Sequence, residues 1–152
     1  MAAVIAIALL ATACGGTADS DAEPSSDGGI SSGLPDPCTL VNAEVLDSYF
    51  TQAVEPERGS VGPLVTCRWV DDDADSLLIQ VRAGTEVHRF EDCDQCSDLT
   101  FADDGFAWTS PAQSGADFVV DGTWHSVTTT GMGDDLDSIA ALAETVYEVA
   151  YG

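Results

Sequence analysis

Two short segments of alternating apolar and polar residues, joined by an acidic turn, constrain the fold of this chain most strongly. In residues 77–83 the apolar side chains occupy every second position, with Gln80 and Arg82 between them. That period of two is typical of a β-strand with one buried side. In residues 65–70 Cys67 and Trp69 stand two positions apart and therefore point to the same side. An aspartate-rich turn separates the segments, so they are predicted to pair as an antiparallel hairpin.

Further strands are predicted downstream, at residues 106–109, 117–120 and 124–130. Asp121 and Gly122 separate the last two of them and are typical of a tight hairpin turn. In the last strand we expect Trp124 to point into the core and His125 to point to solvent, because neighbouring strand residues lie on opposite faces. Residues 59–63 are predicted to form a loop, and residues 84–100 are not assigned to a helix or a strand.

Apolar residues at helix-like spacing flank these strands. A first helix is predicted near residues 42–50, where Asn42 is suited to cap the first turn. A closing helix is predicted from residue 136 to about residue 150, with Asp134 or Asp135 as its cap. This order of elements predicts an α+β fold. An antiparallel sheet of about five strands should carry N- and C-terminal helices packed on one face.

The charge of the chain excludes several classes of partner. It has 27 Asp and Glu residues against 4 arginines and no lysine, and its formal net charge is −23 at pH 7. With so few cations the chain is a poor match for the phosphates of nucleic acid, and an anionic membrane surface repels its folded part. Because 45% of the residues are hydrophobic, the composition is still that of a globular domain.

The N-terminal segment predicts export. Residues 1–13 are free of charge and apolar, too short to span a bilayer but suited to a signal peptide. Residues 10–14 resemble a bacterial lipobox, in which signal cleavage exposes a cysteine for lipidation, here Cys14. The alternative is an ordinary secretory signal with a cysteine beside it. Residues 14–35 are rich in Gly, Ser, Asp and Pro, so we expect a lipidated Cys14 on a flexible acidic tether, followed by a single domain at 36–152.

The domain contains four cysteines, Cys38, Cys67, Cys93 and Cys96. An even number in an exported domain indicates two disulfides, and four cysteines allow three pairings. We favour Cys38 with Cys67 and Cys93 with Cys96. The Cys-x-x-Cys spacing of the second pair also leaves open a redox-active pair or, with His88 and His125, a metal site. The aspartates around this pair disfavour a thiolate, and the spacing of the histidines fits no zinc template.

Three motifs carry a resemblance to a known family: Asp36-Pro37-Cys38 before the first helix, Cys67-Arg68-Trp69 on a strand, and the apolar helix at 136–149. Together with the lipobox they resemble small actinobacterial envelope lipoproteins of unknown function. The resemblance covers about residues 36–150 and implies a bridge from the Asp-Pro-Cys motif to the Cys-x-Trp strand. Cys93 and Cys96 are not part of its pattern. It implies an envelope lipoprotein without known catalysis, so no catalytic residue is carried over.

No arrangement of residues in the sequence predicts catalysis. Alternate aspartates of the turn at 71–75 match the first three ligands of a calcium loop. Ser76 and Arg82 stand at its sixth and twelfth positions, where Gly and Glu are required, so weak calcium binding stays only an alternative. Ser126 follows His125 directly on a strand, so the two side chains should point to opposite faces and not act together.

The candidate ligand-binding residues are aromatic. Trp69, Trp108 and Trp124 either line a pocket between the sheet and a helix or simply fill the core. The sequence therefore predicts a non-enzymatic lipoprotein on the outer face of the cytoplasmic membrane, held there through Cys14. Its domain should bind a small ligand, a peptide or an envelope protein, with no cofactor, no metal and no nucleic acid. The alternatives are a redox protein using Cys93 and Cys96, or a weak calcium-binding module.

Overall fold

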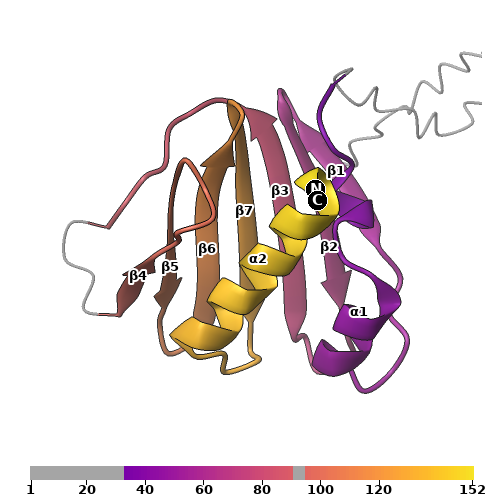
Figure 1. Cartoon of the computed structure of the whole chain (residues 1–152). Helices are drawn as coiled ribbons and strands as arrows, with labels where there is room; N and C mark the ends of the chain where they lie inside the picture. The colour runs from indigo at the N-terminus through magenta and orange to yellow at the C-terminus, as the bar shows by residue number, and fades with distance from the viewer. Residues whose placement is uncertain (1–32, 91–94) are drawn as a thin grey trace, which may run out of the picture.

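The structure, a computed structural model, describes residues 33–90 and 95–152. These residues form a seven-stranded antiparallel sheet with two helices, α1 and α2, on one side of it (Figure 1). In chain order the elements are the 3₁₀ turn η1 (Pro37–Thr39), α1 (Ala43–Tyr49), β1 (Glu57–Val61), β2 (Leu64–Val70), β3 (Ser76–Ala83), β4 (Cys96–Asp98), β5 (Asp104–Thr109), β6 (Gln113–Val120), β7 (Thr123–Thr130) and α2 (Leu136–Tyr151). The expected signal peptide, Cys14, the tether up to residue 32 and Cys93 lie outside the described residues.

The α+β class and the antiparallel sheet are confirmed, but the expectation of about five strands is wrong. The described residues form seven strands in the order β1-β2-β3-β7-β6-β5-β4, and the two unpredicted ones lie at the two edges. All five residues of β1 are exposed, although part of this segment was expected to form a loop. The other edge strand, β4, has three residues. Edge strands of this kind are held by pairing on one side, so their sequences carry no pattern of period two.

The two helices differ in size. The domain opens on η1, and α1 is only 7 residues long, so the expectation of a helix at each end is correct only for α2, which has 16 residues. Within the described residues, no helix is long and apolar enough to cross a membrane.

The predicted local signals are confirmed. The side chain of Asn42 accepts a hydrogen bond of 3.0 Å from the backbone N–H three residues on and caps α1. Of the two candidate caps for α2, Asp135 takes this role, with a hydrogen bond of 2.9 Å, and not Asp134. The turn between β6 and β7 has positive φ at Asp121 (49°) and Gly122 (73°), which is typical of a two-residue hairpin turn.

The cross-strand register assigns each sheet residue to a helix-facing side or to a far face. Ile79, Ala116 and Val127 lie in one row across β3, β7 and β6 and share the core with Ile139 and Leu142 of α2. This row defines the helix-facing side. Residues at the alternate positions form the far face, and those used below are Arg82, Phe106, Trp108, Gly115, Asp117 and Trp124.

The inward and outward positions in β7 are the reverse of those expected. Trp124 pairs with Arg82 on the far face and is half-buried, whereas His125 lies on the helix-facing side and is 0% exposed. The large apolar residues of this strand, Trp124 and Val127, stand an odd number of positions apart, so they cannot share a face. Val127 takes the core position, and His125, two residues before it on the same face, is therefore buried as well.

Candidate functional site

The three tryptophans do not line one pocket. Trp69 lies on the helix-facing side of β2, is 1% exposed and fills the core. Trp108 on β5 and Trp124 on β7 lie on the far face, and both are half-buried. The expected pocket lined by all three between sheet and helix is therefore wrong, because strand parity sends the indoles to opposite sides of the sheet.

Trp108 covers the backbone of β6 because its cross-strand partner is a glycine. An ideal Cβ at Gly115 would lie 2.5 Å from Cζ2 and 2.7 Å from Cε2 of the indole, closer than real contacts allow. The indole Nε1–H donates a hydrogen bond of 3.4 Å to Oδ2 of Asp117, two residues along β6. Gly115 therefore makes room for the ring, and Asp117 fixes its orientation.

The segment after β3 brings a second ring to Trp108. The centroids of Phe90 and Trp108 are 5.5 Å apart and their planes are at 84°, an edge-to-face contact. Arg89 fixes this segment by donating hydrogen bonds to the carboxylates of Asp98 at 2.6 Å and of Asp104 at 2.7 Å. Phe90 is nevertheless 56% exposed. An apolar ring is thus held firmly at the surface next to a half-buried indole.

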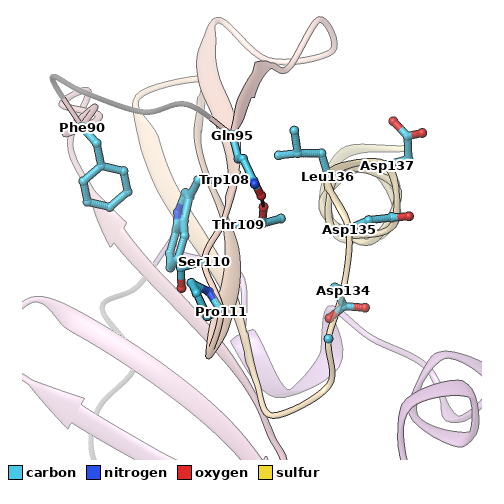
Figure 2. Close-up of a pocket in the computed structure, with 11 residues that line it drawn as sticks. Phe90, Gln95, Trp108, Thr109, Ser110, Pro111, Asp134, Asp135, Leu136 and Asp137 are labelled. Atoms are coloured by element: carbon cyan, nitrogen blue, oxygen red, sulfur yellow. Dashed lines mark hydrogen bonds between the residues drawn. The ribbon is translucent and has the colours of Figure 1, made fainter.

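An open pocket of about 1180 Å³ begins at these two rings. Figure 2 shows Phe90, Trp108 and Pro111 on one side of the end of β5, and Gln95, Thr109 and the start of α2 on the other side. The side chains of Gln95 and Thr109 are joined by a hydrogen bond of 2.7 Å. We call Phe90, Trp108 and Pro111 the apolar wall of the pocket. The remaining lining residues are Ser110, Gly133, Asp134, Asp135, Leu136 and Asp137.

Asp117 is an unusual carboxyl group for an open sheet face. Burial raises its pKa, while hydrogen bonds from Ser126 and Trp108 and the charges of His88 and Arg82 act in the opposite direction and are outweighed. In the part of the chain that the structure describes, no ion pair includes Asp117. Its carboxylate is therefore partly removed from water, beside an indole, and makes no ion pair with the described residues.

Other rings of the far face carry cations of the chain itself. The guanidinium carbon of Arg82 lies 4.8 Å from the ring centroid of Trp124. That of Arg89 lies 5.4 Å from the centroid of Phe106. Both distances are typical of cation–π contacts. Two aromatic side chains of this face, Trp124 and Phe106, therefore already bind guanidinium groups within the fold.

His125 was expected to face solvent but is buried, and its contacts indicate a structural role. Its imidazole stacks on Phe118, with centroids 4.9 Å apart and planes at 10°, and Nε2 lies 2.7 Å from the hydroxyl of Tyr151. No described group is hydrogen-bonded to Nδ1, which is buried. Burial lowers the pKa of His125 to about 4, so the ring is neutral at pH 7. A neutral ring buried in the core serves packing and does not reach a ligand.

The described residues test part of the predicted disulfide pairing. Cys38 and Cys67 form the predicted disulfide, which joins η1 to β2 across a Cα–Cα distance of 5.1 Å. Cys96, at the start of β4, is also disulfide-bonded. Because Cys93 lies outside the described residues, its pairing with Cys96 and any redox role of the two stay predictions.

In the acidic turn between β2 and β3, one carboxylate is hydrogen-bonded to the backbone of the turn itself. Oδ1 of Asp71 accepts hydrogen bonds from the N–H groups of Asp73 and Asp75, each at 3.0 Å. Across residues 33–90 and 95–152, no group of three or more His, Cys, Asp or Glu side chains is placed to hold a metal ion.

Of the predicted ligand-binding residues, only Trp108 lines the pocket. Phe90 and Gln95 belong to the stretch 84–100, which has no pattern of period two, and Pro111 follows a strand without a signal of its own. The available signal was Gly115, since a glycine inside a strand marks a close approach of another group. Its meaning depends on the β5–β6 register, which brings Trp108 opposite to it.

Comparison of the chain with protein-family models, with curated proteins and with solved structures found no match. The resemblance to actinobacterial lipoproteins therefore stays a prediction.

Proposed function

We propose that this chain is a non-enzymatic, lipid-anchored envelope protein whose domain binds a small ligand, a peptide or a protein partner at the pocket beside Trp108. The observation that carries the binding role is the apolar wall. Phe90 stays 56% exposed although it contacts the rings of Phe106 and Trp108. Leaving apolar surface in water is unfavourable, and pockets with apolar walls and a few polar groups are typical ligand sites. A partner that covers Phe90 and Trp108 removes that cost.

The polar groups around the apolar wall favour binding over a purely structural role. The amide of Gln95 and the hydroxyls of Thr109 and Ser110 line the same pocket and can orient a bound group. A pocket of about 1180 Å³ has room for a peptide segment or a small organic ligand.

A photo-reactive phenylalanine analogue in place of Pro111 tests the binding site in the living cell. Pro111 is exposed and belongs to the apolar wall, so we expect irradiation to produce a discrete cross-linked product. The matched control carries the analogue at Val149, which is 48% exposed near the end of α2 and lies about 20 Å along the helix from the pocket. The same product from both positions, or none from Pro111, would contradict binding at this pocket.

The anchor is supported by the sequence. An apolar segment of 13 residues precedes Cys14, and a polar tether follows it. A lipidated cysteine with at least two acyl chains holds a protein firmly on a membrane, and we expect it to hold the domain at the outer face of the cytoplasmic membrane. Metabolic labelling with a fatty acid should label the natural chain and the control variant Cys96→Ser, but not Cys14→Ser. Equal labelling of all three would rule out this anchor.

A further inference from the structure

Three of the four arginines of the chain are already engaged. It has 4 arginines and no lysine against 27 acidic residues. Arg58 pairs with Asp36 at 2.6 Å, and Arg89 pairs with two aspartates. Arg82 lies over Trp124. The surface therefore retains a large excess of negative charge, which attracts positively charged partners and speeds their association.

Trp108 differs from the other aromatic residues of the far face. Trp124 and Phe106 each have a guanidinium of the chain over the ring. Among the described contacts of Trp108 are the edge-to-face ring of Phe90 and the hydrogen bond to Asp117, and no cation lies over its ring. Its half-buried ring faces an open pocket.

Asp117 makes this indole a better receptor for a cation. An N–H group that donates to a carboxylate shifts electron density into the ring, and a cation over the ring is attracted by that density. The carboxylate itself lies partly buried without an ion pair within the described residues. A cation near Trp108 thus gains from the ring and from the charge of Asp117, at a point where water screens both only in part.

The rest of the pocket agrees in charge. At the start of α2, the pocket is lined by Asp134, Asp135 and Asp137, and none of its lining residues is basic. The side chains of Asp135 and Asp137 point away from the apolar wall (Figure 2), and Asp134 accepts a hydrogen bond from the hydroxyl of Thr129, so these carboxylates contribute to the field of the pocket and not to the contact at Trp108.

We propose that the pocket binds an arginine side chain of a basic peptide or protein partner, with the guanidinium over Trp108 and next to Asp117. The chain contains two examples of the same contact, Arg82 on Trp124 and Arg89 on Phe106. Guanidinium suits the site better than an ammonium ion, because its planar group stacks on an indole and pairs with a carboxylate. The proposal rests on the proposed function and gives the chemistry of the partner.

Two capped peptides that differ only in charge test this inference on the full chain. One alternates arginine with glycine, and the other has citrulline, a neutral analogue of arginine, at the same positions. Isothermal calorimetry should show that the arginine peptide binds at least about tenfold more tightly. Asp117→Asn should weaken its binding several-fold. The matched control is Asp72→Asn, which removes the same charge from an exposed turn and should leave the affinity nearly unchanged.

Trp108→Phe keeps an apolar ring and should weaken the arginine peptide about threefold or more, since an indole binds cations best. Near-ultraviolet circular dichroism confirms that each variant is folded. Equal affinity for both peptides would overturn the inference, and so would equal effects of Asp117→Asn and Asp72→Asn, because attraction would then come from net charge alone. If the cross-link at Pro111 forms but the two peptides bind equally well, the proposed binding function is retained and the proposed cationic partner is rejected. The arginine proposal would also be rejected if a neutral oligosaccharide bound in place of the arginine peptide and the Trp108→Phe variant no longer bound that oligosaccharide.

Discussion

Lowering the pH should destabilise this domain through His125 in a way that can be separated from every other titrating group. The imidazole is 0% exposed, and burial lowers its pKa to about 4 from 6.5. Above pH 6.5 the ring is neutral in both the folded and the unfolded chain, and its titration contributes nothing. Between pH 6.5 and 4 the unfolded chain binds a proton that the folded chain does not, so the free energy of unfolding falls. Below pH 4 both states bind the proton and the contribution is constant.

The size of this effect follows from the difference between the two pKa values. At about 1.4 kcal/mol for each pKa unit, the shift of His125 lowers the free energy of unfolding by about 3 kcal/mol across this range. That is a large part of the stability of a small domain. The cause is specific: Nδ1 has no described hydrogen-bond partner, and Nε2 faces a neutral hydroxyl of Tyr151 rather than a carboxylate.

His125→Gln removes the titration and keeps an amide that can reach Tyr151. Urea unfolding at several values between pH 7 and pH 4 gives the free energy of unfolding of the natural chain and the variant. Their difference cancels the carboxylates, including Asp117, whose raised pKa acts in the opposite direction in both proteins. We expect the difference to change by about 3 kcal/mol in this range. The chain has 2 histidines, so His88→Gln, at an exposed position, is the complete control.

A direct readout is the pH midpoint of the His125 ring signals in nuclear magnetic resonance, which should lie near pH 4. A difference between the natural chain and His125→Gln that stays flat from pH 6.5 to 4, or a midpoint near 6.5, would refute the assignment of His125 as a buried neutral ring.

Three further predictions concern packing, covalent links and charge. Gly115→Ala places a Cβ 2.5 Å from the Trp108 ring, so it should cost about 1–3 kcal/mol in urea unfolding and alter tryptophan fluorescence; an unchanged midpoint would contradict the close contact. Replacing both Cys38 and Cys67 with alanine removes a link across 29 residues and should lower the free energy of unfolding by about 3–4 kcal/mol, and a loss below about 1 kcal/mol would mean that the unfolded chain is not constrained by this link. The melting temperature should rise from low to high sodium chloride, because salt screens the mutual repulsion behind a net charge of −23, and a flat response would show that the acids lie too far apart to matter.

The parts of the fold that could be predicted from the sequence are those whose cause is local. The β2–β3 hairpin follows from alternation, the β6–β7 turn from the positive φ that Asp121 and Gly122 tolerate, and the helix starts from Asn42 and Asp135. Each signal lies within a few residues of its effect. The edge strands β1 and β4 lack such a signal, since pairing with a neighbour defines them and no buried side is required.

The candidate site depends on contacts between residues that are distant in sequence, which is why little of it could be predicted. Trp108 was named as a candidate, but its place over Gly115 follows from the register of β5 and β6. Phe90 reaches it because Arg89 bonds to carboxylates on both strands of the β4–β5 hairpin. His125 is buried because Val127 takes the core position of β7. In each case a neighbouring strand decides which of two equally allowed faces a side chain takes.

The acidity of the chain has two components with different consequences. Asp36, Asp71 and Asp135 each accept hydrogen bonds from backbone N–H groups and so fix η1, the β2–β3 turn and the start of α2. Uncharged residues such as Asn or Ser perform the same task, so local structure does not require the charge. The chain has only 4 cations against 27 acidic residues, and the ion pairs of the described residues neutralise only Asp36, Asp98 and Asp104, so most of the acidic charges add to one negative field. A field of that size repels anionic partners and other copies of the chain alike, so a basic partner is the class that gains from it, and in our proposal Trp108 with Asp117 is the place where that gain becomes a specific contact.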